Sequence, residues 1–472
     1  MKNVIKNILS AFVVVELIVL GIVYFSDVTE RKESREKFAQ FYDAEENIDV
    51  LFVGSSHVLN GIFPMELWNE YGIVSYNMAG HGNRMILNYW VLMNALEHTS
   101  PKLVVLDAYM LSLEDKLSGL EQLHISADSI PYSQTKVDMI NDLVEEEDRK
   151  SDFLWKFSTY HNRWNELTES DFTCISTPEK GAESRIDVAV PVEMVYFEAD
   201  YKTPEEDGLG VEYACKIIEE CQERGIEILI TYLPFPENTG WQGESNRMAE
   251  IAKEYNVDFL DYYTLLEQVN LDTDYYDQDS HMNPSGARKV TSYIGNYIMQ
   301  NYSVEDQREN EVYSSWHEDY EIYTEFKKDN IQKEKELKNY LMLLSDKNFS
   351  YGVYFKPWSN LGAHPVLVQL LSGIGIDYTQ SPNEDHFLLV DNGTGERKVM
   401  RLFETMETKF ADFSMFYNDD GHLELTNSEA ESMIITHSDI AVVVFDNSDL
   451  SFVDQAKFTL QDAVLEFEED KE

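Results

Sequence analysis

The strongest constraint on how this chain can fold is an apolar run near its N-terminus. The run ILSAFVVVELIVLGIVYF extends over eighteen residues from Ile8 to Phe25 and carries one charged residue, Glu16. As a helix rising about 1.5 Å per residue, a segment of this length just crosses a bilayer core of about 30 Å. The next residues, Ser26 to Thr29, lack a small-residue cleavage pattern. We therefore expect an uncleaved signal anchor over residues 1–26, followed by a charged stalk over residues 27–46.

The overall charge excludes one large class of functions. The chain has 472 residues, with 37 Lys and Arg against 87 Asp and Glu, which gives a net charge of −50. Nucleic-acid binding depends on clustered cationic side chains, so we exclude it. A hydrophobic content of 43% is enough for a sizeable core, so the acidity does not indicate disorder. Basic residues flank the apolar run on both sides and do not orient it in a membrane.

The cysteines indicate neither a disulfide framework nor a metal site. Cys174, Cys215 and Cys221 form no C-x-x-C pair, and an odd number of cysteines cannot all pair within one chain. We expect buried thiols, no structural zinc, and no cofactor.

Short apolar strands alternate with helical segments between residues 47 and 303. The expected strands are Val50–Val53, Val74–Asn77, Leu103–Leu106, Ile226–Tyr232 and Val257–Leu260. The expected helices are Met65–Tyr71, Met85–Leu96, Val211–Arg224, Ser245–Tyr255 and Gly286–Asn301. This alternation predicts an α/β domain with a three-layer, flavodoxin-like arrangement: a parallel sheet covered by helices on both faces. Ligand sites in such folds lie at the carboxyl ends of the strands.

The remaining segments differ from this pattern. The alternation fails over about residues 108–200, where we expect a helical, acidic insertion that lines the cleft. Residues 304–340 are highly charged and predict a solvated helical connector. Residues 341–472 contain strand-like runs, turn signals and a helix candidate at Pro365–Leu371, which predict a smaller α+β or β-sandwich-like domain.

The first chemical motif is VLFVGSSH, from Val50 to His57. An apolar strand that ends in Gly and Ser can place a hydroxyl on a tight strand-to-helix turn, where a nucleophile is exposed. Alone, the pattern is also typical of an ordinary turn.

The second motif is YYDQDSHMNPSG, more than 200 residues later. His281 lies in it near Asp277 and Asp279, just before a helix opened by Pro and Gly. A serine needs an imidazole to accept its proton and a carboxylate to hold that imidazole in one tautomer. The order Ser, then Asp-x-His, meets this need.

Together these motifs resemble the SGNH/GDSL hydrolase superfamily over roughly Ile48 to Tyr302. The chain resembles in particular its membrane-anchored bacterial members of the teichoic-acid D-alanylation and alginate acetylation types. The resemblance aligns Gly54-Ser55-Ser56 with the family's first block, with Ser55 in the usual Asp place, and implies that Ser56 is the nucleophile and His281 the base. The second block, a Gly after a strand, falls on Gly80 within YNMAGHGN.

The carboxylate partner of His281 is left open by the sequence. Hydrolytic members of the family typically have an Asp three residues before the His, where this chain has Gln278. Asp279 matches the D-x-H spacing of the alginate-type proteins and is the preferred partner, with Asp277 as the alternative.

The third block departs from the family as well. It normally supplies an Asn to the oxyanion hole, but the matching strand end carries Asp107. An ionised carboxylate would repel an oxyanion, so Asp107 is protonated, or points elsewhere, or Asn83 substitutes for the missing amide. The backbone N–H groups of Ser56 and Gly80 are the other expected donors.

Aromatic and basic residues supply candidates for substrate binding. His57 follows the nucleophile and is expected at the rim of the site. The insertion contains Tyr160, His161, Arg163 and Trp164, a combination that suits sugar rings and anionic groups but also an ordinary packed helix start. Trp241, in the loop after the Ile226 strand, is a further candidate.

The resemblance implies a membrane-anchored, extracytoplasmic serine acyltransferase or esterase. Its expected acceptor is an envelope polysaccharide or a teichoic-acid-like polymer, and its expected partner is a polytopic membrane O-acyltransferase. Hydrolysis differs from transfer only in using water as the acceptor. The alternative is a non-catalytic envelope-binding or assembly protein that keeps the fold without the chemistry.

Overall fold

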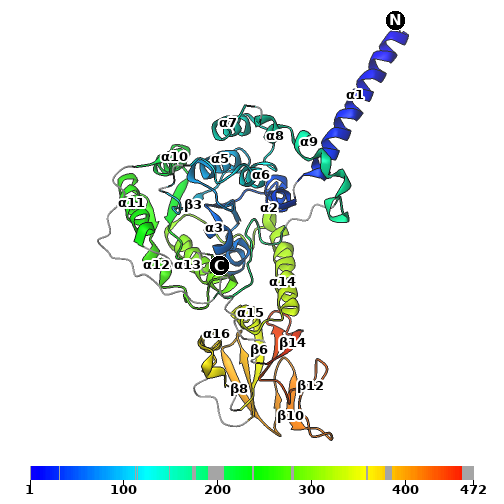
Figure 1. Ribbon diagram of the computed structural model, residues 1–472, viewed down its shortest axis with the longest axis vertical. Helices are drawn as coiled ribbons and strands as arrows, with labels where there is room; N and C mark the ends of the chain where they lie inside the picture. Colours follow the sequence, from blue (N-terminus) through cyan, green and yellow to red (C-terminus); the bar gives the residue numbers. More distant parts are fainter. Residues whose placement is uncertain are drawn as a thin grey trace, which may run out of the picture. The chain divides into compact units, whose positions relative to one another are not determined.

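The fold is taken from a computed structural model of the chain (Figure 1). It describes residues 2–30, 32–111, 113, 115–147, 149–172, 177–189, 207–235, 239–277, 281–357, 360–377 and 385–459. Tertiary contacts divide the chain into two compact units. The first unit comprises Met1–Glu183, Val195–Glu267 and Val290–Tyr320. The second unit comprises Ser184–Met194, Gln268–Lys289 and Glu321–Glu472.

The apolar N-terminal run forms a single helix, α1 (Lys2–Thr29), as Figure 1 shows. Its segment Ile5–Thr29 has a mean hydropathy of 2.6, and none of its most apolar window is buried inside the structure. Length and composition are therefore sufficient to cross a membrane, which is compatible with a single-pass anchor. Helix α2 (Lys32–Asp43) follows it.

A five-stranded parallel sheet organises the rest of the first unit and confirms the predicted α/β fold. The strands, in the order β2-β1-β3-β4-β5, are β1 (Val50–Val53), β2 (Ser75–Asn77), β3 (Leu103–Asp107), β4 (Glu227–Thr231) and β5 (Asp258–Leu260). Strands β1 and β3 are buried along their whole length, as expected for a central parallel sheet. The order changes direction between β1 and β3, and in open parallel sheets ligands bind at the carboxyl ends of the strands at such a point.

Helices flank the sheet, and their apolar faces cover it. They are α3 (Ser56–Gly61), α4 (Pro64–Tyr71), α5 (Met85–Ala95), α10 (Leu209–Arg224), α11 (Thr239–Tyr255) and α12 (Tyr262–Leu266). Two further helices, α13 (Pro284–Asn301) and α14 (Ser315–Lys333), each pass along the chain from one unit into the other, and η3 (Glu311–Tyr313) lies between them.

Short helices form the insertion after β3. They are α6 (Leu120–Ala127), α7 (Gln134–Leu143), α8 (Lys150–Leu154), α9 (Lys156–Tyr160), η1 (His161–Asn165) and η2 (Glu169–Asp171). The predicted insertion extends to about residue 200, and its last part, from residue 190, lies outside the described residues.

The second unit is built on two antiparallel sheets, with strand orders β14-β13-β6-β7-β8 and β12-β11-β10-β9. The strands are β6 (Phe349–Phe355), β7 (His386–Asp391), β8 (Glu396–Arg401), β9 (Thr405–Glu407), β10 (Asp412–Tyr417), β11 (Leu423–Asn427), β12 (Met433–Ile434), β13 (Ile440–Asp446) and β14 (Phe452–Phe458). Its helices are α15 (Leu337–Leu343), η4 (Asn360–Ala363) and α16 (Pro365–Gly373).

Strand β13 shows why these sheets pack as they do. Its side chains alternate between two cores: Val443 and Phe445 meet Phe413 of the other sheet, whereas Val442 and Val444 belong to the core that includes α15 and α16. One face of the larger sheet therefore packs on the smaller sheet and the other on helices, which confirms the predicted α+β, sandwich-like module.

Two segments that are distant in sequence join the second unit. The Lys338 ammonium lies 2.7 Å from the Asp187 carboxylate, and the Ala189 N–H donates to the Tyr275 carbonyl at 2.9 Å. The loop that carries His281 therefore belongs to the second unit. The domain predicted over residues 47–303 includes both this loop and Ser56.

Gly352 of β6 gives a direct test of the sandwich core. A Cβ at this position would lie 2.0 Å from the Phe387 ring. We predict that Gly352→Ala lowers the free energy of unfolding of the second unit by about 1–3 kcal/mol, because the ring must move. Urea unfolding measures the loss. Gly373→Ala, which meets no atom within 4 Å, is the control and should cause no comparable loss.

Candidate active site

Ser56 occupies the tight turn that the sequence predicts. Gly54 follows the last residue of β1, Ser55 is the N-cap of α3, and Ser56 is the first residue of that helix. A Cβ on Gly54 would come within 2.5 Å of Val58 Cγ2 and 3.1 Å of Asp107 Cβ. Only glycine permits this close packing of the helix on the ends of β1 and β3.

Asn77, which the sequence did not single out, ties this turn to the neighbouring strand. It is completely buried at the end of β2, and its Nδ2 donates to the carbonyls of Val58 at 2.8 Å and Ile62 at 3.0 Å. Its Oδ1 accepts the Ala79 N–H at 3.1 Å. Two of these hydrogen bonds fix α3 and its C-cap Ile62 against β2, and the third holds the Asn77 side chain to the residues that follow β2. A sequence signal for this role existed, because an Asn at the end of an apolar strand is unusual. The sequence does not show which groups the Asn77 side chain bonds, because those groups are brought to it by the fold.

Asn83 presents a buried donor beside Gly80. Its Oδ1 accepts the Ser126 hydroxyl at 3.1 Å, while its Nδ2 has no hydrogen-bond partner within the described part of the chain. A Cβ on Gly80 would lie 2.9 Å from this Nδ2. A buried donor left unpaired costs about 1–3 kcal/mol, a cost that a ligand oxygen would remove. The Gly80 N–H, by contrast, already donates to the Gly54 carbonyl at 3.3 Å.

Asp107 is turned toward the neighbouring strand. Its carboxylate accepts the backbone N–H of Leu233 at 2.9 Å, that of Tyr109 at 3.3 Å, and the Thr231 hydroxyl at 3.3 Å. Burial raises the pKa of this carboxyl to about 7, although the backbone hydrogen bonds act in the opposite direction. Asp107 thus joins the ends of β3 and β4, so of the alternatives left open by the sequence its carboxyl points elsewhere, toward β4.

An aromatic cluster forms next to the serine turn. The His57 ring stacks on Tyr109 with centroids 3.8 Å apart, and it lies 4.7 Å from the Phe235 ring. Trp241 completes the cluster, 4.8 Å from Tyr109. The structure thus brings together two of the predicted binding residues, His57 and Trp241, with two aromatics from the loops after β3 and β4 that the sequence had not indicated.

The second unit holds the predicted base. His281 Nδ1 lies 2.6 Å from Asp277 Oδ2, and the His281 N–H donates to Asp277 Oδ1 at 3.0 Å. The ring also stacks on Tyr276, with centroids 5.4 Å apart. With Nδ1–H donated to a carboxylate, Nε2 carries the basic lone pair. The preferred sequence partner, Asp279, and its neighbour Gln278 lie outside the described residues.

Polar contacts fix the loop that carries His281. Asn283, fully buried, donates from Nδ2 to the Thr273 carbonyl at 2.8 Å. Asp274, also fully buried, pairs with the Lys289 ammonium at 2.6 Å. These bonds join the loop to the first turns of α13. The sequence motif contained Asn283 but gave no reason to separate its role from that of the neighbouring residues.

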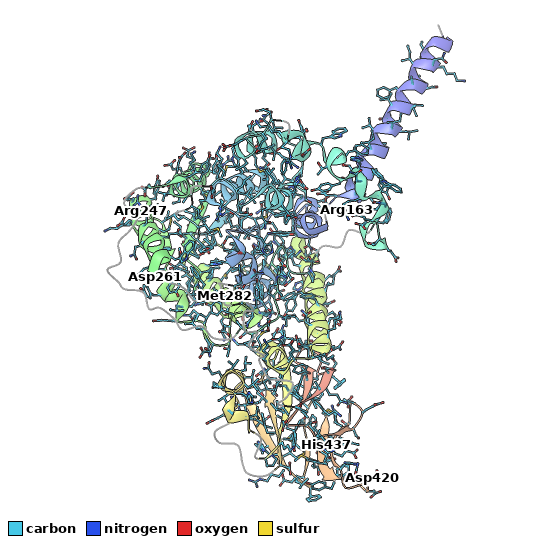
Figure 2. All side chains as sticks on the ribbon, in the orientation of Figure 1. Arg163, Arg247, Asp261, Met282, Asp420 and His437 are labelled. Atoms are coloured by element: carbon cyan, nitrogen blue, oxygen red, sulfur yellow. The ribbon has the colours of Figure 1, made fainter. Side chains whose placement is uncertain are left out.

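Arg163, predicted to bind substrate, is occupied at the end of α1. Its guanidinium donates to the carbonyls of Thr29, at 2.8 Å, and of Glu30, and it pairs with the Asp171 carboxylate at 3.1 Å. Figure 2 shows Arg163 beside the base of α1. These carbonyls lack partners within the helix, so Arg163 caps it.

The other candidates in the insertion are divided between core and surface. Tyr160 is buried and donates to Asp128, whereas His161 and Trp164 are exposed. Their role in substrate binding stays a prediction, and the structure groups them with the end of α1 rather than with the aromatic cluster around His57.

A second exposed histidine–carboxylate pair lies in the same unit as Ser56. His81 Nε2 is 2.8 Å from Glu183 Oε2, and both side chains are about one-third exposed. The Glu183 backbone is bonded to α3 at Leu59 and Asn60, at 3.0 and 2.7 Å. The sequence could not indicate this pair because its members are 102 residues apart.

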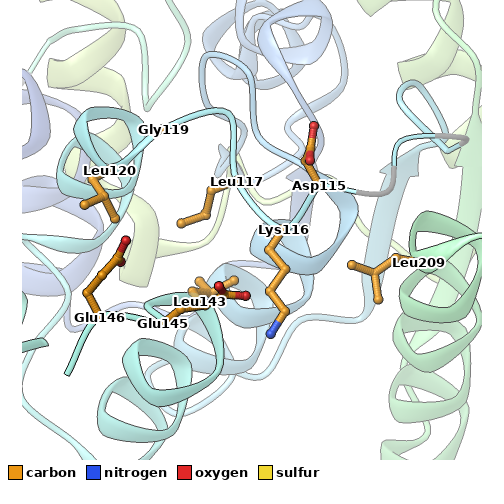
Figure 3. Close-up of a pocket in the computed structure, with 9 residues that line it drawn as sticks. All are labelled: Asp115, Lys116, Leu117, Gly119, Leu120, Leu143, Glu145, Glu146 and Leu209. Carbon is orange, nitrogen blue, oxygen red and sulfur yellow. The ribbon is translucent and has the colours of Figure 1, made fainter. Parts of the chain in front are cut away.

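One open pocket, of ≈ 420 Å³, lies within the insertion (Figure 3). Its lining residues are Asp115, Lys116, Leu117, Gly119, Leu120, Leu143, Glu145, Glu146 and Leu209. Among its described lining residues the cation is Lys116, which donates to the Asp142 carbonyl at 2.9 Å. None of the predicted site residues that the structure describes is among them.

The described residues offer no group of three or more His, Cys, Asp or Glu side chains that could hold a metal ion. Burial raises the pKa of the Cys221 thiol to about 12, which keeps it protonated and unreactive. Burial also raises the pKa of Cys215, and Cys174 lies outside the described residues.

Comparisons with known proteins give similarity at the level of solved structures only. No protein-family model and no curated protein matches the sequence. One similar structure is a proposed acylhydrolase from Bacteroides fragilis, with 13% identity, a TM-score of 0.30, and coverage of 56% of this chain and 95% of that chain. A second is a proposed lipolytic protein of the G-D-S-L family from Desulfitobacterium hafniense, with 12% identity, a TM-score of 0.28, and coverage of 53% and 99%.

A third is a GDSL-like lipase from Bacteroides thetaiotaomicron, with 11% identity, a TM-score of 0.30, and coverage of 57% of this chain and 99% of that chain.

The pKa of Asp107 predicts a pH-dependent stability. Its folded value of about 7 lies above the ordinary value of 3.8, so between these pH values the folded state keeps a proton that the unfolded state has lost. The contribution of Asp107 is therefore present at low pH and is lost as pH rises through 7, by up to about 1.4 kcal/mol per pH unit.

The Asp107→Asn variant has no carboxyl to titrate at this position, so its free energy of unfolding should lack this pH-dependent contribution. Urea unfolding of both proteins between pH 5 and 8 should show that the stability advantage of the wild type over the variant shrinks as pH rises. Parallel stability curves would contradict the raised pKa.

Proposed function

We propose that the chain is a membrane-anchored, extracytoplasmic acyl-transfer enzyme in which Ser56 is the nucleophile and His281 the base. The observation that carries this proposal is the 2.6 Å contact between Asp277 Oδ2 and His281 Nδ1, the contact by which a carboxylate orients an imidazole base. The strand-to-helix turn that carries Ser56 supports it. Asp277, rather than Asp279, is the proposed carboxylate.

The reaction has two halves. Ser56 Oγ attacks an acyl carbonyl as its proton passes to His281, and His281 then protonates the leaving group. An acceptor hydroxyl next attacks the acyl-enzyme, again giving its proton to His281, and Ser56 regains a proton when the ester bond breaks. Asp277 stabilises the imidazolium in each half.

The oxyanion is proposed to bind the amide of Asn83 and the N–H of Ser56. The unpaired, buried Nδ2 of Asn83 supports this assignment, since a preorganised donor needs no rearrangement when charge develops. The aromatic cluster of His57, Tyr109, Phe235 and Trp241 supports binding of a ring-shaped or apolar substrate group.

The proposed setting follows from α1 and from the family resemblance. A helix apolar enough to span a membrane supports anchoring of the body at the membrane. The proposed acceptor is an envelope polysaccharide or a teichoic-acid-like polymer, and the proposed partner is a polytopic membrane O-acyltransferase. Water would serve as the acceptor in an esterase.

A fluorophosphonate probe tests the nucleophile. The full chain in detergent should be labelled, and Ser56→Ala should abolish labelling because the probe bonds an activated serine oxygen. Ser55→Ala is the matched control: it removes the α3 cap, at about 1 kcal/mol, and should still be labelled. A folded chain that takes no label would favour the alternative of a non-catalytic binding or assembly protein.

The carboxylate is tested by paired substitutions. Asp277→Asn should lower kcat for hydrolysis of p-nitrophenyl acetate about 10²–10⁴-fold, because the His281 tautomer is no longer held. Asp279→Asn should leave kcat within a few-fold of wild type. The opposite pattern would assign the role to Asp279.

A further inference from the structure

We propose that the insertion rests on the bilayer surface beside α1, with its exposed aromatic side chains in the lipid headgroup region. This inference rests on the membrane anchoring proposed above, and it adds a second membrane contact that lies in the folded body.

The end of α1 is built into the insertion. The Phe25 ring lies 5.9 Å from the Phe157 ring of α9, and Thr29 and Glu30 are buried. Arg163 caps the helix through the carbonyls of both buried residues. Because Phe25 ends the apolar run, Phe157 lies where α1 leaves the hydrocarbon. Helix α9 and η1 are therefore held at the level of the membrane interface.

Four large aromatic side chains stand exposed on this part of the chain. Their exposed fractions are 75% for Tyr132, 54% for Trp155, 65% for Trp164 and 56% for Phe172. Outside α1, the other large hydrophobic side chains exposed among the described residues of the first unit are Tyr263 and Val312. Exposed aromatic surface in this unit is thus concentrated in the insertion.

Each of these side chains is close in sequence to a residue fixed at α1. Trp155 and Trp164 flank Phe157 and Arg163, which contact the helix directly. Two further contacts place the others: Ser129 donates to the Glu30 carboxylate at 2.8 Å, three residues before Tyr132, and Asp171, paired with Arg163, precedes Phe172.

The amphipathic character of these aromatic side chains favours the lipid–water interface as their partner. Trp and Tyr combine an apolar ring with a polar edge and are enriched where hydrocarbon meets water. Exposed apolar side chains gathered on one part of a surface mark an interaction site. Because residues next to these side chains contact the end of a helix that can cross the bilayer, lipid is the nearest occupant.

The charges around the patch argue against electrostatic attraction to anionic lipid. Arg163 is occupied by α1 and Asp171, Arg149 pairs with Asp152 at 3.0 Å, and Lys150 pairs with Glu147 at 2.6 Å. The proposed contact with lipid is therefore made by the aromatic side chains, so it should persist on zwitterionic membranes and at high salt. Its effect is to restrict rotation of the first unit about α1.

Quenching of tryptophan fluorescence by brominated lipids tests the contact. The full chain, which has 7 tryptophans, is reconstituted into phosphatidylcholine vesicles brominated at carbons 6 and 7 or at carbons 11 and 12. The shallow bromines should quench the wild type more strongly than the deep ones. In Trp155→Phe/Trp164→Phe the quenched fraction should fall at least two-fold. Trp316→Phe, at a buried site in the same unit, should cause no fall.

Three outcomes would overturn the inference. Equal quenching in the double variant and the wild type would show that these rings do not reach lipid, and would leave a membrane protein partner as their occupant. Deep bromines as effective as shallow ones would place them below the interface. A chain that fails to float with vesicles would remove the anchor itself, which separates failure of the proposed localisation from failure of the surface contact. Near-UV circular dichroism checks that the double variant is folded.

Discussion

The hydrogen bonds of Asn77 hold the turn on which the proposed chemistry depends. A serine at the end of a central strand is useful only if its helix stays in one position, and α3 is a helix of only 6 residues. Helices this short are not stable alone, so tertiary contacts must supply their stability. One buried amide bonded to the carbonyls of Val58 in α3 and of Ile62 at its C-cap, together with the close approach allowed by Gly54, supplies them.

Two polar side chains near the carboxyl ends of the strands, Asp107 and Asn83, differ in how fully their hydrogen-bonding groups are paired. Asp107 is surrounded by donors from β4 and its loop, so it acts as a structural link between strands. Asn83 has its oxygen satisfied and its nitrogen unpaired, so it retains a donor for a ligand. The direction of each side chain, rather than its place in a motif, therefore decides which groups it can bond.

The insertion of the first unit also joins the body of this unit to the end of α1. The same insertion that interrupts the α/β alternation caps the last turn of α1 and carries most of the exposed aromatic rings of this unit. In this arrangement the Arg163 guanidinium bonds the end of α1 and Asp171. Because the insertion is added outside the strand order, it makes these contacts without any loss of packing in the sheet.

The sequence by itself determined the membrane-length helix, the five parallel strands with their helices, the sandwich-like second module and the strand-to-helix turn at Ser56. Each of these follows from local periodicity or from residue types that a few neighbouring positions constrain. The expected exposure of the turn at Ser56 was wrong, because α3 packs closely on the strand ends and Ser56 is only 7% exposed. Only the tertiary structure decided that Asp277 contacts His281, that Asp107 turns to β4, that Arg163 caps α1, and that His81 pairs with Glu183. These choices depend on contacts between segments far apart in the chain and on side-chain direction, which hydrophobic pattern and motif spacing do not encode.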